Sequence, residues 1–135
     1  MTLTDVPLLS MLREKMAWLN SRQALLSQNV ANADMPGYAA RDLKPIDFEQ
    51  SLHDATRRDA STLRVTDPHH ITIRNASAEF QEEQSGQGAP NESGNTVAIE
   101  EEMIKVADTQ AQYQAAANIY SKAVSMMRTA IGHGG

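Results

Sequence analysis

The sequence has no cysteine, few aromatic residues and no long uninterrupted apolar run. Without cysteine the chain forms no disulfide and no thiolate metal site, which fits a reducing cytosol or a periplasmic protein that avoids thiols. No segment approaches the roughly 20 apolar residues of a membrane-spanning helix. The N-terminus carries Asp5 and Pro7 and has no basic region leading an apolar core, so we expect no cleaved secretory signal. A protein of this kind needs another route to leave the cytoplasm.

Basic charge is also scarce. The net charge is −5, whereas nucleic acids and anionic membranes select basic surfaces. We therefore expect no nucleic-acid partner and no direct lipid binding. The length of 135 residues fits one domain, but aromatic residues make up only 4% of the chain and much of its apolar content is alanine. Long helices packed along narrow seams use such a composition better than a large globular core does.

No catalytic, cofactor-binding or metal-binding constellation stands out. His69 and His70 are adjacent, and no second ligand cluster lies at metal-site spacing from them. Three successive acids, Glu100–Glu102, are typical of a solvated first helical turn, where they offset the helix dipole. The glycines between residues 86 and 94 follow no apolar strand and precede no lysine, so they do not make a phosphate loop. We expect no enzyme activity, no cofactor and no bound metal.

Two segments at opposite ends of the chain have heptad periodicity, which predicts seams between packed helices. In the first segment the seam positions are Leu9, Leu12, Met16, Leu19, Gln23, Leu26, Val30 and Ala33. In the second segment they are Ile99, Met103, Val106, Gln110, Tyr113, Ala117, Tyr120, Val124, Met127 and Ile131. We predict a mainly α fold in which helices within residues 1–34 and 96–135 pair as an antiparallel, coiled-coil-like hairpin.

Each seam contains one glutamine, Gln23 or Gln110. A polar residue at a seam position can fix the register of two helices, although it can also simply turn out to solvent at a loose point. The second segment has a further apolar face beside its seam, made by Ile104, Ala107, Ala111, Ala116, Ile119 and Ala123. A helix with two apolar faces needs more than one neighbour, and other subunits would supply it.

The helix ends are marked by capping and stop residues. Asp5 can cap the first helix, with Pro7 in its opening turn. Thr96 can cap the last helix, and Glu100–Glu102 would then lie near the positive end of its dipole. Gly132 follows the last seam residue as a stop signal.

The middle of the chain has a different character. Residues 35–78 contain turn signals and short strand candidates at Leu63–Val65 and Ile71–Ile73. Residues 79–95 are polar and rich in glycine and acids, which is typical of a flexible linker. We therefore divide the chain into two terminal helices, an irregular and partly β middle segment, and a linker.

A short motif follows the first helix, from Ser27 to Tyr38. Asn29 and Asn32 suit a helix terminus because asparagine tolerates left-handed backbone geometry. Pro36–Gly37 fits the central pair of a type II turn. Tyr38 would then place an aromatic ring with a polar tip just past the corner, in position to dock on a neighbour.

This motif resembles the N-terminal signature of the bacterial flagellar rod, hook and hook-associated proteins. The matching residues are Asn29, Ala31, Asn32, Pro36, Gly37 and Tyr38, while Met35 replaces the usual threonine. Ala39–Leu43 with Asp47–Phe48, and Gly94–Met103 at the entry to the last helix, are similar to the proximal-rod members of the family. The short length also favours the proximal rod, since distal-rod and hook proteins carry larger middle domains.

The resemblance implies a structural subunit of the proximal rod in the periplasmic part of the flagellar basal body. Such subunits polymerise into an axial drive shaft that transmits torque and encloses the export channel. Their partners would be further copies, other rod proteins and the junction with the membrane ring and export gate. The resemblance also implies export by the flagellar type III apparatus. The alternative is a soluble helical binding module, such as an export chaperone or a regulator.

Overall fold

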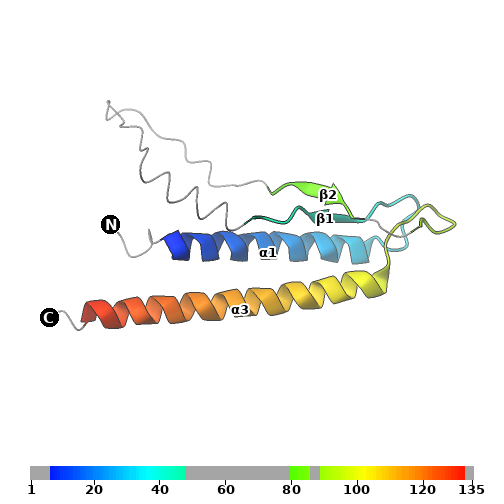
Figure 1. The fold of residues 1–135 in the computed structure, drawn as a ribbon. Helices are drawn as coiled ribbons and strands as arrows, with labels where there is room; N and C mark the ends of the chain where they lie inside the picture. Colours follow the sequence, from blue (N-terminus) through cyan, green and yellow to red (C-terminus); the bar gives the residue numbers. More distant parts are fainter. Residues whose placement is uncertain (1–6, 48–79, 86–88, 133–135) are drawn as a thin grey trace, which may run out of the picture.

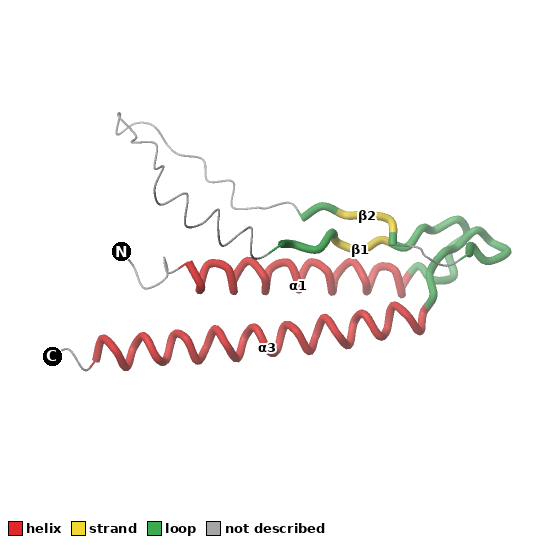
Figure 2. Tube along the Cα trace, viewed as in Figure 1, coloured by secondary structure: helices red, strands yellow, loops and turns green. Residues whose placement is uncertain are grey.

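The computed structural model describes residues 7–47, 80–85 and 89–132. Two long helices run side by side in opposite directions, and a short two-stranded ribbon lies beside the first of them (Figure 1, Figure 2). The elements are α1 (Pro7–Ala31), β1 (Arg41–Leu43), β2 (Glu82–Gln84) and α3 (Ile99–Gly132). The start of α1 and the end of α3 lie at one end of the hairpin, and the turns lie at the other (Figure 1). This arrangement confirms the predicted mainly helical, antiparallel hairpin.

Helix α1 is the middle layer, with the ribbon on one side and α3 on the other (Figure 1). Two apolar clusters correspond to these two contacts. Between α1 and the ribbon lie Trp18, Leu19, Leu25 and Leu43, with Ile46 and Phe80 packed against them. Near the open end of the hairpin lie Leu9, Leu12 and Ala123, with Tyr120, Val124 and Met127 packed against them. Helix α1 is therefore covered on two sides, whereas the main packing of α3 on the other described elements is against α1.

The face that α3 buries against α1 follows a seven-residue repeat. Its buried residues are Glu102, Thr109, Ala116 and Ala123. Ala116 and Ala123 were expected on a second, outward face, but both are buried inside the hairpin. Small side chains at a helix contact let the two axes approach closely, which explains why alanines and a threonine occupy this row.

The start of α3 differs from the sequence expectation. The helix begins at Ile99, and Thr96 does not cap it, because its Oγ1 accepts a hydrogen bond from the backbone N–H of Ala40 at 2.9 Å. Glu100 and Glu101 are exposed, as expected of acids near the helix dipole. Glu102 is only 2% exposed, so its assignment to a solvated face was wrong. Asp5 lies outside the described residues.

The ribbon contains a strand within the stretch assigned to a polar linker. Strand β2 pairs antiparallel with β1, with Asp42 opposite Glu83. Flanking bonds from Lys44 N–H to Gln81 O and from Ser85 N–H to Ala40 O extend the pairing. All three side chains of β2 are exposed, so the strand depends on backbone pairing and leaves no apolar pattern in the sequence. The other strand candidates, Leu63–Val65 and Ile71–Ile73, lie outside the described residues.

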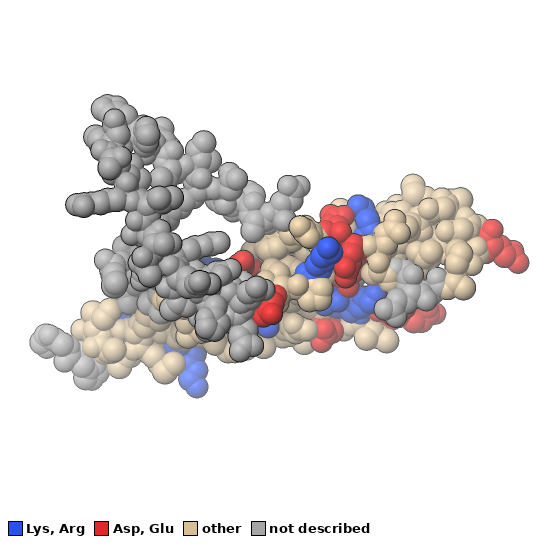
Figure 3. All heavy atoms as spheres, turned by 45° about the horizontal axis from the view of Figure 1, so that its top comes forward, with Lys and Arg blue, Asp and Glu red and all other residues tan. Residues whose placement is uncertain are grey.

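Charge is unevenly distributed over the visible described surface. In the view of Figure 3, acidic and basic side chains intermingle around the ribbon and its end of the hairpin, whereas the described surface toward the chain termini is mostly uncharged. The exposed Arg41–Glu82 ion pair, 2.9 Å between Nη1 and Oε2, links the two strands of this charged region.

Candidate functional site

The motif that follows α1 folds as the predicted tight turn. Tyr38 N–H donates to Met35 O at 3.3 Å, which places Pro36 and Gly37 at the two central positions. Gly37 has φ +71°, as the third residue of a type II turn requires. Both the proline and the glycine are thus explained by local backbone geometry.

A second turn, residues 91–94, docks on the first. Gly94 N–H donates to Asn91 O at 2.8 Å, and Gly37 N–H donates to Ser93 O at 2.9 Å. Gly94 has φ +78°, and a Cβ added there would lie 3.6 Å from the Cα of Gly37. The two turns therefore meet through glycine backbones, and this contact brings the start of α3 against the end of α1.

Asn95 joins the second turn to the C-terminal end of α1. Its side chain is buried, and its Nδ2 donates to the carbonyl oxygens of Asn32, Ala33 and Met35 at 3.0, 2.8 and 2.7 Å. Its Oδ1 accepts from Val97 N–H at 2.8 Å. All three carbonyls belong to the turn that directly follows α1, so Asn95 holds this turn against the start of α3.

Asn29 is the centre of the contact between α1, β1 and α3. Its side chain is 0% exposed. Its Nδ2 donates to Arg41 O at 2.6 Å and to Glu102 Oε2 at 2.8 Å. Its Oδ1 accepts from Arg41 N–H at 3.1 Å and from the Tyr38 hydroxyl at 3.2 Å. The amide is fully hydrogen-bonded, and Lys105 Nζ, 3.1 Å from Glu102 Oε1, balances the buried carboxylate.

These bonds correct the expected role of the motif asparagines. Asn29 lies inside α1, and no described residue other than glycine has a positive φ. Asn32 follows the helix, and its Nδ2 donates back to Gln28 O at 2.8 Å. The asparagines act through their side-chain amides and not through left-handed backbone geometry.

An ion pair holds the ribbon on α1. Arg22 Nε and Nη2 donate to the two carboxylate oxygens of Asp42, both at 2.8 Å. Burial alone would raise the pKa of Asp42, but the hydrogen bonds from Arg22 and from Leu43 N–H, with the charge of Arg22, outweigh it and lower that pKa. The same pairing with Asp42 raises the pKa of Arg22. The guanidinium lies 5.5 Å from the centre of the Trp18 ring, whose Nε1 donates to Lys44 O at 3.0 Å.

The predicted seam residues fall into three groups by exposure. Leu12, Leu19 and Leu26 are buried. The half-buried residues are Met16, Val30, Val106, Tyr120, Val124 and Met127. The exposed residues are Met103, Tyr113 and Ile131. The row of α3 that faces α1 is thus centred on Ala116 and Ala123, and part of the expected seam is turned outward.

Helix α3 leaves large apolar side chains exposed on both sides of its buried face. Among the described residues, the only exposed large apolar residues outside α3 are Leu8 and Met35. At 3.6 residues per turn, two mostly apolar rows of α3 flank its buried face, and their members are exposed except for the half-buried Ala117 and Val124. The first flank consists of Ile99, Met103, Gln110, Ala117, Val124 and Ile131. The second flank consists of Ile104, Ala111, Ala115, Ile119 and Met126. Three apolar rows on one helix exceed what a two-helix hairpin can cover.

Several of these contacts have no local signal in the sequence. The buried Glu102 partner of Asn29 is 73 residues away in sequence, and Asp42 is 20 residues from Arg22. Asn95 looks like an ordinary turn residue until its three carbonyl partners are seen. Pairing over such separations leaves no local pattern, so only the fold reveals it.

The described residues form a helical hairpin with hydrogen-bonded turns and an incompletely covered last helix. No family model matches the sequence. The chain is 36% identical over 121 residues, 84% of each chain, to the flagellar basal body rod protein FlgB of Escherichia coli K12. It is 32% identical over 111 residues to FlgB of Cereibacter sphaeroides ATCC 17029 (82% of this chain, 83% of the relative).

FlgB of Agrobacterium fabrum is 27% identical over 129 residues, 93% of each chain. The chain belongs to the FlgB family of flagellar basal-body rod proteins. This confirms the family that the turn motif indicated. The relatives are named as rod proteins and not as enzymes. In the described part of the chain, neither helix combines the length and the apolar character needed to cross a membrane.

Proposed function

We propose that this chain is a subunit of the flagellar proximal rod that polymerises through its terminal helices into the axial drive shaft. In that shaft α1 and α3 pair within each subunit, and their outward faces pack on neighbouring subunits around the axis. The shaft transmits torque and encloses the export channel. The exposed apolar flanks of α3 are the single observation that carries this proposal.

The two flanks support contacts with two neighbours. The first and second flanks lie on opposite sides of the buried face, and each includes strongly exposed apolar residues, such as Met103 at 61% and Ile104 at 70%. Different surfaces on the two sides favour a head-to-tail contact, which closes into rings or continues as a helix. Burial of apolar surface at about 25 cal/mol per Å² supplies the driving force for such packing.

The locked turns would stiffen one end of each subunit. The Asn29 and Asn95 contacts join the end of α1, the turn and the start of α3 through buried hydrogen bonds. A shaft under torque needs many such interlocked contacts, since exposed ion pairs contribute little individually. The partners in this proposal are further copies, other rod proteins and the membrane-ring and export-gate junction at the rod base.

Export by the flagellar type III apparatus belongs to the same proposal. A subunit whose helices are incompletely buried alone gains its full order only from its neighbours. Such a chain can travel in an unfolded state and fold at the growing end, without a cleaved signal peptide.

Ile119 on the second flank provides the test. Ile119 is 53% exposed, so Ile119→Asp should leave the hairpin intact and place a charge in the proposed interface, where an unpaired buried charge is costly. We expect loss of swimming and loss of rods from isolated basal bodies. Asn118→Asp is the matched control, because it adds the same charge to the adjacent exposed residue, outside both flanks, and we expect swimming to continue.

Normal rods in the Ile119→Asp strain would contradict the proposal. A chain that remains a discrete small oligomer in the cytosol, and never enters basal bodies, would instead support the alternative of an export chaperone or regulator. Measuring the protein in purified basal bodies separates these outcomes.

A further inference from the structure

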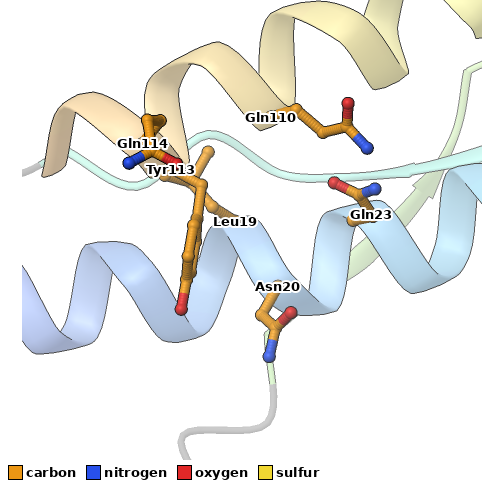
Figure 4. A pocket seen from close by; sticks show the side chains of 6 residues that line it. All are labelled: Leu19, Asn20, Gln23, Gln110, Tyr113 and Gln114. Carbon is orange, nitrogen blue, oxygen red and sulfur yellow. The ribbon is translucent and has the colours of Figure 1, made fainter. Parts of the chain in front are cut away.

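A polar cleft opens between the two helices halfway along the hairpin. It has a volume of about 400 Å³ and is lined by Leu19, Asn20, Gln23, Gln110, Tyr113 and Gln114. Figure 4 shows Gln23 and Gln110 reaching from α1 and α3 toward the same gap, with the Tyr113 ring crossing from α3 toward α1. A water molecule occupies about 30 Å³ in the liquid, so the cleft has room for a side chain.

The amides that face this cleft are not used within the described part of the chain. Neither Gln23 nor Gln110 forms a side-chain hydrogen bond with another described residue, although their amide groups face each other (Figure 4). Gln114 has one long contact, 3.5 Å from its Nε2 to Asn118 Oδ1, on the solvent side of α3. The two seam glutamines therefore do not hold the hairpin in register by bonding to each other.

Gln110 is also the one polar member of the first flank of α3, whose other members are apolar. A neighbour that covers this flank also covers the mouth of the cleft. An amide buried without a hydrogen-bond partner carries a desolvation penalty. A neighbour of purely apolar surface would thus be disfavoured at this level of the helix, and a neighbour with a hydrogen-bonding side chain would be favoured.

We propose that a second copy of this chain inserts a polar side chain into the cleft and hydrogen-bonds to Gln23 and Gln110. The second copy carries a fitting group on its opposite flank. Gln112 and Asp108 lie at the same level of α3 on that side, joined by a 2.8 Å bond from Gln112 Nε2 to Asp108 Oδ2. Amide N–H groups in the cleft match the free lone pairs of this carboxylate. This inference rests on the proposed rod function and adds the axial alignment of neighbouring copies.

The first test separates hairpin stability from assembly. The double variant Gln23→Met and Gln110→Met keeps side-chain length and helix propensity but removes both amides. We expect the isolated chain to show at least the parental helix signal in circular dichroism, because the cleft loses unpaired polar groups. We expect the variant strain to lose swimming, because the neighbour's polar side chain loses its partners.

Gln28→Met is the matched control, since Gln28 is an exposed glutamine of α1 outside the cleft. Its strain is expected to swim as the parent does. Normal swimming of the double variant would overturn the cleft inference. If Ile119→Asp still abolishes rods in that case, the proposed rod function stands although the cleft inference has failed. If the double variant instead lowers the helix signal of the isolated chain, the glutamines serve the hairpin itself and the inference fails.

The second test identifies the occupant. Because the chain contains no cysteine, Gln114→Cys and Ala111→Cys introduce single thiols. Gln114 lines the cleft without being one of the two bonding glutamines, and Ala111 is exposed on the second flank beside Gln112. A strain that produces both proteins can be treated with a short bifunctional thiol reagent. We expect a cross-linked dimer of the two variants in isolated basal bodies, absent from a strain that makes Gln28→Cys with Ala111→Cys. A cross-link from position 114 to a different rod protein, or none at all, would overturn the assignment of a second copy.

Discussion

At the scale of single residues, Asn29 forms more hydrogen bonds to other elements than its place in a turn motif suggests. One amide satisfies the backbone N–H and C=O of Arg41, the hydroxyl of Tyr38 and the carboxylate of Glu102. A buried group left without a partner costs about 1–3 kcal/mol, and more when it is charged. The structural value of Asn29 therefore lies in its position at the meeting point of three elements.

Asn29→Ala should consequently destabilise the isolated chain by at least about 2 kcal/mol, because it leaves the Arg41 backbone and Glu102 without their partner. Amide hydrogen exchange around Asn29 and Glu102 in the isolated chain measures the change in the free energy of local opening. Asn20→Ala, at an exposed position of the same helix, should stay within about 0.5 kcal/mol of the parent. Equal effects of the two substitutions would show that the buried network adds no stability.

At the scale of elements, the Arg22–Asp42 pair predicts an acid response of the ribbon. The folded state lowers the pKa of Asp42 below the value of about 3.9 expected in an unfolded chain. The stabilisation from this carboxylate is therefore present above about pH 4 and is lost as the pH falls through the folded pKa. We expect Asp42→Asn to lower stability by about 1–3 kcal/mol at neutral pH.

Hydrogen exchange of the ribbon amides in the isolated chain, measured from neutral pH down to the acid range and corrected for the intrinsic exchange rate at each pH, checks this response. The difference in the free energy of local opening between the parent and Asp42→Asn should shrink as the pH falls below about 4. Glu82→Gln serves as the control, because its pair with Arg41 is exposed and should contribute little at any pH. A difference that stays constant across the acid range would mean that the charge of Asp42 is not what stabilises the ribbon.

The elements also show how far the sequence could predict this fold. Heptad spacing was sufficient to find both helices and their antiparallel pairing, because apolar periodicity is a local property. It could not decide which row of α3 faces α1, because α3 has apolar residues on several sides, and the row that is buried contains Glu102 and Thr109. Long-range contacts identify that row: Glu102 bonds to Asn29, and Ala123 packs on Leu9 and Leu12. Strand β2 was missed because its three side chains are exposed and its backbone bonds alone define it.

Only part of the Ser27–Tyr38 motif could be predicted, because a sequence shows local properties and not long-range contacts. The turn at Pro36–Gly37 follows from the fixed φ of proline and the freedom of glycine, which are properties of two adjacent residues. The Tyr38 hydroxyl donates to Asn29 of its own chain, a bond that the two residues' places in the sequence did not predict. The contacts made by Asn95 depend on carbonyls 60 or more residues earlier, and a single sequence contains no sign of them.

At the scale of the whole molecule, stabilising contacts are unequally distributed along the hairpin. The buried hydrogen-bond networks of Asn29 and Asn95 lie at the turn end. The open end depends on the cluster of Leu9, Leu12 and Ala123 with three half-buried neighbours, while large apolar residues such as Met126 and Ile131 remain exposed there. Local opening is easiest where few apolar side chains are buried and backbone hydrogen bonds are exposed. We therefore expect the hairpin to open first at the end where the chain termini lie.

In the dilute isolated chain, we therefore predict low overall helix content, protease cleavage first near the chain ends, and the slowest amide hydrogen exchange around Asn29 and Glu102. Amides near Met11 and Ser125 should exchange much faster there, and should become protected once neighbouring subunits cover the flanks of α3 in assembled rods. Hydrogen exchange on both forms, read by mass spectrometry, gives the comparison. Uniform protection of both helices in a stable, cooperatively melting monomer would contradict the prediction, since such a chain would bury its apolar rows without any partner.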